Sequence, residues 1–213
     1  MTMSGFEQRV RHGLVRHGVA LDAAKIEQLS SYLALLERWN ARMNLTALED
    51  PQAAVDRLIV EPILAAQSID VPARVLVDVG SGGGSPAIPL RIAKPDLLLT
   101  MIESKARKSV FLREVARHLG LADVLVESGR FEDVLSRPEV LGTIDVLSAR
   151  AVKVGADELR LFAAALRPGG QQLWFTSGTQ PTSELPGPFA LESEAPLVTG
   201  LRSRLLVLRK ALE

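Results

Sequence analysis

The amino-acid sequence predicts an α/β protein built on a mostly parallel β-sheet, and three observations support this class. From Arg74 onward, short runs rich in Val, Leu and Ile alternate with segments of helical periodicity, as in parallel strands joined by right-handed crossover helices. The first of these runs leads directly into a glycine-rich turn. The length of 213 residues and the hydrophobic content of 47% provide enough apolar side chain for a substantial core.

The rest of the chain is organised around the stretch from Arg74 to Leu90, RVLVDVGSGGGSPAIPL. Its apolar run predicts a strand that is buried on both faces and ends at Asp78. Four of the next five residues, 80–84, are glycine, so this turn can bend sharply and let the backbone approach a ligand. Pro86 suits the first turn of a helix, whose N-terminus offers unpaired N–H groups. The pattern predicts a nucleotide-type binding edge, although an ordinary tight strand-to-helix connection would have a similar sequence.

Two acidic residues narrow the class of ligand. A second predicted strand, 97–102, ends at Glu103, where an acid can accept hydrogen bonds from ribose hydroxyls. Asp78 either accepts N–H bonds from the turn or binds an ammonium group, and it disfavours a pyrophosphate. The turn also lacks the Lys-Ser or Lys-Thr pair of a phosphate-cradling loop. A cationic nucleoside such as S-adenosylmethionine therefore fits better than a nucleoside triphosphate, and a dinucleotide oxidoreductase is disfavoured.

Residues 1–72 are predicted to form a helical extension ahead of a cofactor-binding domain over 73–213. The expected helices cover 5–18, a long segment capped by Asp22 that ends at Asn44, and a segment that starts at Asp50-Pro51. The first of them carries several basic residues, which form either a phosphate-facing patch or a solvated face. The extension is expected to pack on the sheet and to contribute to the substrate face.

The second half of the chain predicts further strands and helices in alternation. A helix over 105–119 is expected to bury Val110, Phe111, Val115 and Leu119, and its basic outer face is either an RNA phosphate track or a solubilising surface. The other expected elements are strands at 124–127, 144–148 and 171–175, a helix at 156–166, a turn at 167–170, a surface loop at 176–187, and strands near 189–192 and 205–208.

Composition disfavours several functional classes. The 25 basic and 25 acidic residues balance, so affinity for nucleic acid from overall charge should be weak. The chain has no cysteine and only three scattered histidines, and we expect no metal site. It has neither an apolar run long enough for a bilayer nor a signal-peptide pattern, which indicates a cytoplasmic protein without membrane contact.

Several motifs together resemble the bacterial 16S ribosomal RNA guanine-N7 methyltransferases, the glucose-inhibited division protein B family. The resemblance extends from about Trp39 to Lys210 and rests on Asn44-Leu45-Thr46, the glycine turn, Glu103-Ser104-Lys105, Arg107-Lys108 with Phe111-Leu112, and Ser148-Ala149-Arg150-Ala151. It implies a Rossmann-like class I methyltransferase fold, with a seven-stranded, mostly parallel sheet, an antiparallel last strand and helices on both faces. It also implies S-adenosylmethionine as cofactor and 16S rRNA or the 30S subunit as partner. We expect the protein to be a monomer.

The resemblance also implies roles for individual residues. The amino-acid end of the cofactor would lie at Asp78, Gly80, Ser81, Gly82, Gly84 and Pro86, its ribose at Glu103, and its adenine near Gly129, Arg130, Phe131 and Glu132. Glu132 is equally well explained as an acid at a helix start. The substrate RNA would contact Asn44, Thr46, Arg107, Lys108 and Arg150. Arg150 would position the target nucleotide, although an Arg at a strand end can also simply pair with an acid.

Guanine N7 carries an in-plane lone pair and no hydrogen, so its methylation requires placement rather than a general base. The chain departs from the family pattern at Ser85 and Ala87, at 57–62, and at Thr176-Ser177-Gly178, where the family has a Lys-Gly pair. Two other functions remain open from the sequence. One is a class I methyltransferase for a small molecule or a protein, and the other is a non-catalytic RNA- or ribosome-binding module that retains the cofactor pocket.

Overall fold

The computed structural model describes residues 2–46, 50–70, 73–177 and 188–212. The N-terminal part is helical, with α1 Met3–Arg16, α2 Ala23–Met43, α3 Pro51–Val55, a π-helical turn Asp56–Val60, α4 Glu61–Ala65 and a 3-10 turn Ala66–Ser68. The remainder alternates, with β1 Val75–Val79, α5 Ala87–Ala93, β2 Leu98–Glu103, α6 Ala106–His118, β3 Val124–Ser128, α7 Phe131–Leu135, β4 Ile144–Arg150, α8 Ala156–Ala165, β5 Leu166–Ser177, β6 Phe189–Pro196 and β7 Ser203–Lys210.

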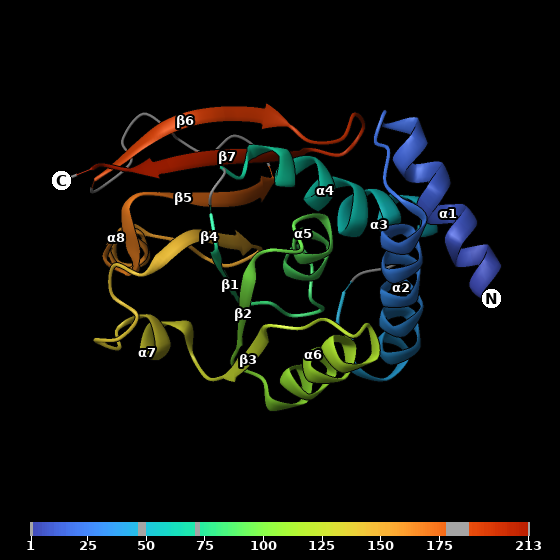
Figure 1. Ribbon diagram of the computed structural model, residues 1–213, viewed down its shortest axis with the longest axis horizontal. Helices are drawn as coiled ribbons and strands as arrows, with labels where there is room; N and C mark the ends of the chain where they lie inside the picture. Colours follow the sequence, from blue (N-terminus) through green and yellow to red (C-terminus); the bar gives the residue numbers. More distant parts are fainter. Residues whose placement is uncertain (1, 47–49, 71–72, 178–187, 213) are drawn as a thin grey trace.

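The seven strands form one sheet in the order β3-β2-β1-β4-β5-β7-β6 (Figure 1). The pairs among β1 to β5 are all parallel, and β7 lies antiparallel between β5 and β6. The predicted class of sheet, with its antiparallel last strand, is therefore confirmed. Because β1 is central and its partners are parallel, the carboxyl ends of β1, β2 and β4 meet at one edge.

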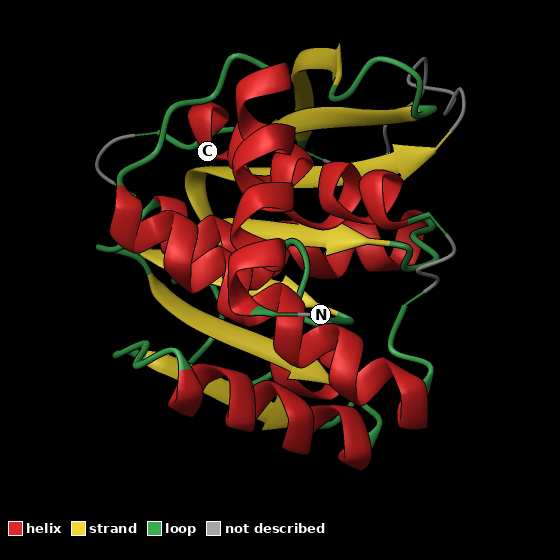
Figure 2. Cartoon of the chain, turned by 90° about the vertical axis from the view of Figure 1, so that its right-hand side faces the viewer, coloured by secondary structure: helices red, strands yellow, loops and turns green. Residues whose placement is uncertain are grey.

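The sheet has apolar cores on both faces. Along β1, Leu76 belongs to the core that contains α2, α5 and α6, whereas Val77 and Val79 belong to the core that contains α7 and α8. This alternation explains why the strand is an almost unbroken apolar run. Figure 2 shows helices in front of the sheet when the molecule is seen from the right-hand side of Figure 1.

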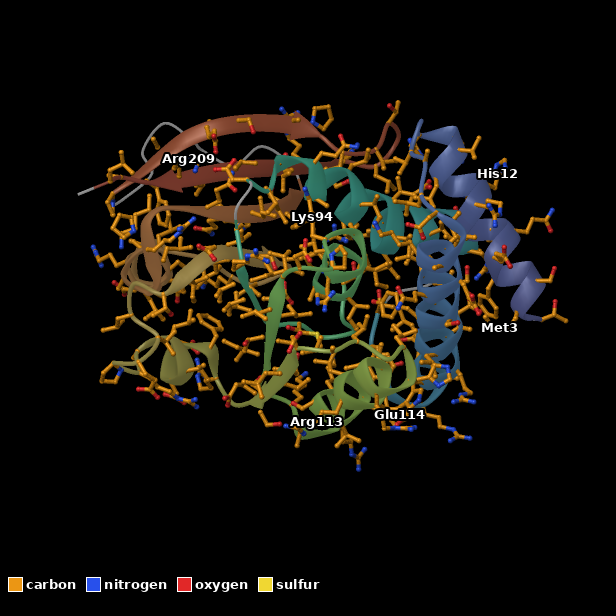
Figure 3. All side chains as sticks on the ribbon, in the orientation of Figure 1. Met3, His12, Lys94, Arg113, Glu114 and Arg209 are labelled. Atoms are coloured by element: carbon orange, nitrogen blue, oxygen red, sulfur yellow. The ribbon has the colours of Figure 1, made fainter. Side chains whose placement is uncertain are left out.

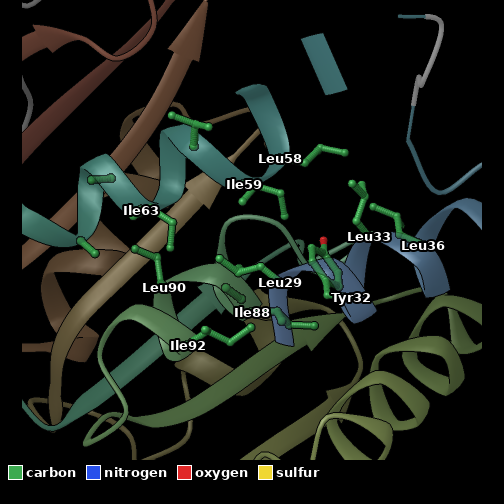
Figure 4. Packing of buried hydrophobic residues seen from close by; sticks show 14 of the residues in the cluster. Leu29, Tyr32, Leu33, Leu36, Leu58, Ile59, Ile63, Ile88, Leu90 and Ile92 are labelled. Carbon is green, nitrogen blue, oxygen red and sulfur yellow. The ribbon is translucent and has the colours of Figure 1, made fainter. Parts of the chain in front are cut away.

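The N-terminal helices begin and end where their capping residues predict. The Asp22 side chain accepts from the Lys25 amide at 2.9 Å, Asn44 ends α2 in the left-handed conformation, and Asp50 caps α3. In Figure 4, side chains of α2 and of the α3–α4 segment pack against Ile88, Leu90 and Ile92 of α5. The helices that precede β1 therefore share one core with the sheet.

The structure corrects two predictions in the sheet domain, one for the buried face of α6 and one for residues 167–170. Val110 is 52% exposed, and α6 instead buries Phe111, Leu112, Val115 and Ala116. A helix turns about 100° per residue, so Val110 cannot lie on the face centred on these four side chains.

The predicted turn at 167–170 is part of β5. Ile144 pairs with Leu166 and Val146 with Gln171, so the extra residues form an irregularity within the strand. Thr176 and Ser177 also belong to β5, and residues 178–187 of the predicted loop lie outside the described residues. The helix expected from Pro86 begins at Ala87. Within the described part of the chain, no helix is long and apolar enough to cross a membrane.

Candidate active site

The glycine turn lies at the carboxyl edge of the sheet, between β1 and α5. The amides of Gly80 and Ser81 both donate to the Ile102 carbonyl, at 2.9 and 3.1 Å, and so attach the turn to β2. Gly80 has a φ of 68°, and a Cβ atom there would lie 2.6 Å from Cγ2 of Val152. Only glycine fits this position without strain and displacement.

Asp78 lies beneath the turn, fully buried on β1. The Ser148 hydroxyl donates to its Oδ1 at 2.5 Å, whereas its Oδ2 has no hydrogen-bond partner. Burial raises the pKa of Asp78 to about 6, against the opposing effects of the hydrogen bond from Ser148 and the charge of Arg150. The amides of Gly80, Ser81 and Gly82 donate to other acceptors, so Asp78 does not accept hydrogen bonds from them, which was one of its two predicted roles. Its carboxylate oxygen without a partner suits the other predicted role, binding an ammonium group.

Glu103 ends β2 and holds the turn from the other side. Its Oε2 accepts from the Gly82 amide and its Oε1 from the Lys105 amide, both at 2.8 Å. Each carboxylate oxygen can accept a second hydrogen bond. Glu103 also lines the cavity at the turn, and it can therefore still accept from a ribose hydroxyl.

This cavity, called here the turn cavity, has a volume of about 370 Å3. Several sequence-predicted site residues line it: Thr46, Gly80, Ser81, Gly82, Glu103, Lys108 and Arg150. The other predicted residues do not line it. Asp78, Gly84 and Pro86 are buried, and Asn44 and Arg107 are exposed on helix ends.

The predicted adenine loop begins beside Glu103, since the Gly129 amide donates to the Glu103 carbonyl at 3.1 Å. Beyond it, Arg130 and Glu132 form an exposed ion pair at 2.6 Å. The ring of Phe131 packs against Phe162 with centroids 5.8 Å apart. Gly129 therefore lies next to the site. Arg130, Phe131 and Glu132 instead contact neighbouring residues of their own segment or of α8.

Tyr32 is a site residue that the sequence analysis missed. It is buried on α2, it lines the turn cavity, and its hydroxyl donates to the Gly83 carbonyl at 2.7 Å. Burial raises its pKa well above the ordinary value. The sequence does contain one indication of this role. Tyr32 lies among the apolar residues of α2, and a buried tyrosine hydroxyl usually has a hydrogen-bond partner.

Arg150 lies at the end of β4, and its guanidinium is held on three sides. It donates to Glu61 Oε2 at 2.9 Å and to the Arg57 carbonyl, and it stacks on the Phe175 ring 4.4 Å from the centroid. Burial lowers the pKa of Arg150 to about 10, although the Glu61 carboxylate opposes this. The ion pair that was one of its two predicted roles is present.

Glu61 is the second residue that the sequence analysis missed. Its exposed fraction is 1%, and its other carboxylate oxygen accepts from the Ser203 hydroxyl. Burial raises its pKa, while Arg150 and Ser203 lower it. The sequence offered only an acid inside an apolar helical run, where a buried partner of opposite charge is the expected reason for its presence.

A second cavity of about 510 Å3, called here the outer cavity, shares Arg57, Arg150 and Ala151 with the turn cavity. Its other lining residues include the basic Lys153 and Arg202 and the aromatic Trp174 and Phe175. Thr176 also lines it, and the Thr176 hydroxyl is buried without a partner. Among the described residues, no group of three or more histidine or acidic side chains could hold a metal ion.

The sheet order, with Asp78 and Glu103 at or near the ends of β1 and β2, is that of the class I methyltransferase fold. Solved structures with the same fold include a putative methyltransferase from Escherichia coli, with a TM-score of 0.58 and 15% identity over 72% of this chain and 86% of that one. The mitomycin 7-O-methyltransferase MmcR has a TM-score of 0.57 and 20% identity over 96% of this chain and 67% of that one.

The chain belongs to the GidB family, rRNA small subunit methyltransferase G, whose family model matches residues 25–188. Relatives called ribosomal RNA small subunit methyltransferase G include one from Stenotrophomonas maltophilia, 40% identical over 90% of this chain and 88% of that protein. One from Xanthomonas axonopodis is 39% identical over 90% of both chains. The resemblance found in the sequence is confirmed: the protein is an S-adenosylmethionine-dependent methyltransferase of small-subunit ribosomal RNA.

Proposed function

We propose that the protein acts as a cytoplasmic monomer and methylates N7 of a guanine in 16S rRNA, with the cofactor in the turn cavity and the target base in the outer cavity. The observation that carries this proposal is that the two cavities meet at Arg150. One is lined by glycine backbone and Glu103, which suit a nucleoside, and the other by basic and aromatic side chains, which suit a nucleotide. Residues 1–72 form an extension that completes the wall of the turn cavity.

The residues around the turn fit S-adenosylmethionine. The partnerless Oδ2 of Asp78 matches the amino group, Glu103 matches the ribose, and the backbone of Gly80–Gly82 permits close approach. Gly129, next to Glu103, borders the adenine, with Arg130, Phe131 and Glu132 beyond it. When bound there, the cofactor supplies a methyl group activated by a sulfonium.

The target guanine needs orientation but no proton transfer, because its N7 has a free lone pair in the plane of the ring. The histidines of the chain, at positions 12, 17 and 118, line neither cavity. Arg150 orients the nucleotide, and Trp174 offers a ring face to the base. Asn44, Thr46, Arg107 and Lys108 contact the flanking RNA.

The pattern of ion pairs supports a polyanionic substrate. Many surface arginines have carboxylate partners, for example Arg11 with Glu7 and Arg160 with Asp157. Apart from Arg150, the basic residues at or beside the two cavities form no ion pair within the described part of the chain: Arg57, Lys105, Arg107, Lys108, Lys153 and Arg202. A protein of zero formal net charge thus still presents unpaired positive charge where phosphates would approach.

The test is transfer of labelled methyl groups to 30S subunits and to naked 16S rRNA that both lack the modification, followed by identification of the labelled nucleoside. We expect N7-methylguanosine at one position. Transfer to a free small acceptor or a protein, with none to either RNA substrate, would contradict the proposal. Cofactor binding without any transfer would instead indicate a non-catalytic binding module.

A further inference from the structure

Two arginines near the end of α2 are exposed and have no carboxylate partner among the residues that the structure describes. Arg38 and Arg42 are one helical turn apart, so they lie on the same side of α2. Neither forms an ion pair with any described residue, whereas Lys25 and Glu37 of the same helix pair with Asp22 and Arg9. These positive charges are therefore available to a partner.

The packing of α2 on α6 brings the end of α2 close to the turn cavity, which Leu45 and Thr46 line. Trp39 contacts Phe111 with ring centroids 5.6 Å apart, and Gln28 Nε2 donates to the Leu119 carbonyl at 3.2 Å. The two helices are therefore antiparallel, and the end of α2 lies beside the start of α6. The α2–α6 basic face, defined as Arg38, Arg42, Lys105, Arg107 and Lys108, lies along both helix ends and includes residues that line the turn cavity.

A hollow of about 360 Å3 adjoins this face, lined by Arg38, Trp39, Arg42 and Met43. Trp39 is half-buried there. A hollow lined by an aromatic side chain and two arginines suits single-stranded nucleic acid, whose bases stack on aromatic faces while cations contact the phosphates.

We propose that a single-stranded segment of RNA next to the target nucleotide crosses the end of α2, with Arg38 and Arg42 on its phosphates and a base on Trp39. The inference rests on the proposed function, because it requires an RNA substrate in the neighbouring cavities. It makes the N-terminal helical extension part of the RNA-binding surface.

The test compares two double variants of the full chain. Arg38→Gln/Arg42→Gln removes the proposed contacts. The control, Arg74→Gln/Lys94→Gln, removes two cations that also form no ion pair in the described residues; Arg74 precedes β1 and Lys94, labelled in Figure 3, ends α5, both at the opposite edge of the sheet. Affinity for unmethylated 16S rRNA is measured over a range of salt concentrations.

We expect the first variant to bind RNA more weakly at low salt and to show a salt dependence of log affinity that is less steep by about 1.4, since each single-strand phosphate contact contributes about 0.7. Its cofactor affinity and melting temperature should equal those of the wild type, and the control should leave RNA binding unchanged. Equal affinities and slopes for wild type and both variants would overturn the inference. If the wild type itself binds no 16S rRNA, the proposed function fails instead.

Stacking on Trp39 has its own measurement. In a Trp174→Phe background, tryptophan fluorescence reports Trp39 alone, because the chain has two tryptophans. A short single-stranded RNA should quench this emission, and the quenching should disappear when Arg38 and Arg42 are also replaced. Binding of the RNA without quenching would overturn the stacking contact.

Discussion

At the scale of single residues, Asp78 makes cofactor binding dependent on pH. Its pKa is raised to about 6 by burial, so the carboxyl is largely protonated below pH 6 and ionised above it. Only the ionised form attracts a cationic ligand. We therefore expect the affinity for S-adenosylmethionine to rise with pH up to about 6 and to fall about tenfold per pH unit below it.

Titration calorimetry between pH 5 and 8 measures this dependence, and Asp78→Asn is the matched variant. It should bind the cofactor more weakly than the wild type at pH 8 and with little change down to pH 5. In the protein without cofactor, the pH dependence of folding stability has the opposite sign to that of cofactor affinity. The folded state binds the extra proton between the ordinary pKa of 3.8 and about 6, so this group lowers the stability of the fold as pH rises through that interval. If cofactor affinity depended on pH in Asp78→Asn as it does in the wild type, Asp78 would not be the group that binds the cationic cofactor.

Glu61 and Arg150 should act as one unit, because each is the buried partner of the other. Glu61→Gln keeps the side-chain volume and the contact with Ser203 but removes the charge that holds the guanidinium in place. We expect kcat/KM to fall about tenfold, which corresponds to a coupling of about 1.4 kcal/mol. In an Arg150→Gln background the same change should have little further effect. Equal losses in both backgrounds would mean that Glu61 acts independently of Arg150.

At the scale of elements, the glycine turn should tolerate no side chain at position 80. Gly80→Ala would place a methyl group against Val152 in a left-handed backbone conformation, whose strain alone costs about 1–2 kcal/mol. We expect a lower melting temperature and at least tenfold weaker cofactor binding. Gly120→Ala is the control, because Gly120 has a similar φ of 61° and nothing within 4 Å of its would-be Cβ. It should lower stability similarly without changing cofactor affinity; equal cofactor binding by both variants would contradict the prediction.

The sequence predicted the elements well where a local pattern determines them. Capping by Asp22 and Asp50, the buried run of β1 and the position of Glu103 are all local, and the structure confirms them. The exposure of Val110 was missed because the four consecutive residues 109–112 of α6 are all apolar or small, so the pattern does not determine the exact centre of its buried face. The turn predicted at 167–170 became part of β5, because pairing with β4 outweighed the local preference of Pro and Gly.

The candidate site was predictable only for residues at strand ends and in the turn. Asp78, Glu103 and Arg150 follow or end strands, and parallel strands place their carboxyl ends together. Tyr32 and Glu61 reach the same place from the N-terminal helices. Tyr32 lies 51 residues before its partner Gly83, and Glu61 lies 89 residues before its partner Arg150. Their contribution depends on how the extension packs, which no local pattern specifies.

At the scale of the whole molecule, stability and RNA binding should respond differently to salt. Most exposed ion pairs contribute little to folding, at about 0–1 kcal/mol each, and the formal charges cancel. The unpaired cations around the cavities should instead make RNA binding strongly salt-dependent. We expect the melting temperature to change by only a few degrees between 50 and 500 mM KCl, while RNA affinity falls by orders of magnitude. If the melting temperature fell steeply with KCl concentration together with RNA affinity, the prediction would be wrong.

Several hydrogen bonds attach the N-terminal helices to the cofactor edge of the sheet. They include Tyr32 to Gly83, Arg150 to Glu61, and the Ser85 hydroxyl to the Leu58 carbonyl at 2.9 Å. The apolar side chains of these helices also belong to the core on one face of the sheet. A fragment that begins at Ala73 would therefore expose this core face and leave the turn without its outer wall. The smallest unit able to methylate RNA should thus include the helices, and evolutionary or engineered shortening of this enzyme from its N-terminus should cost both solubility and catalysis.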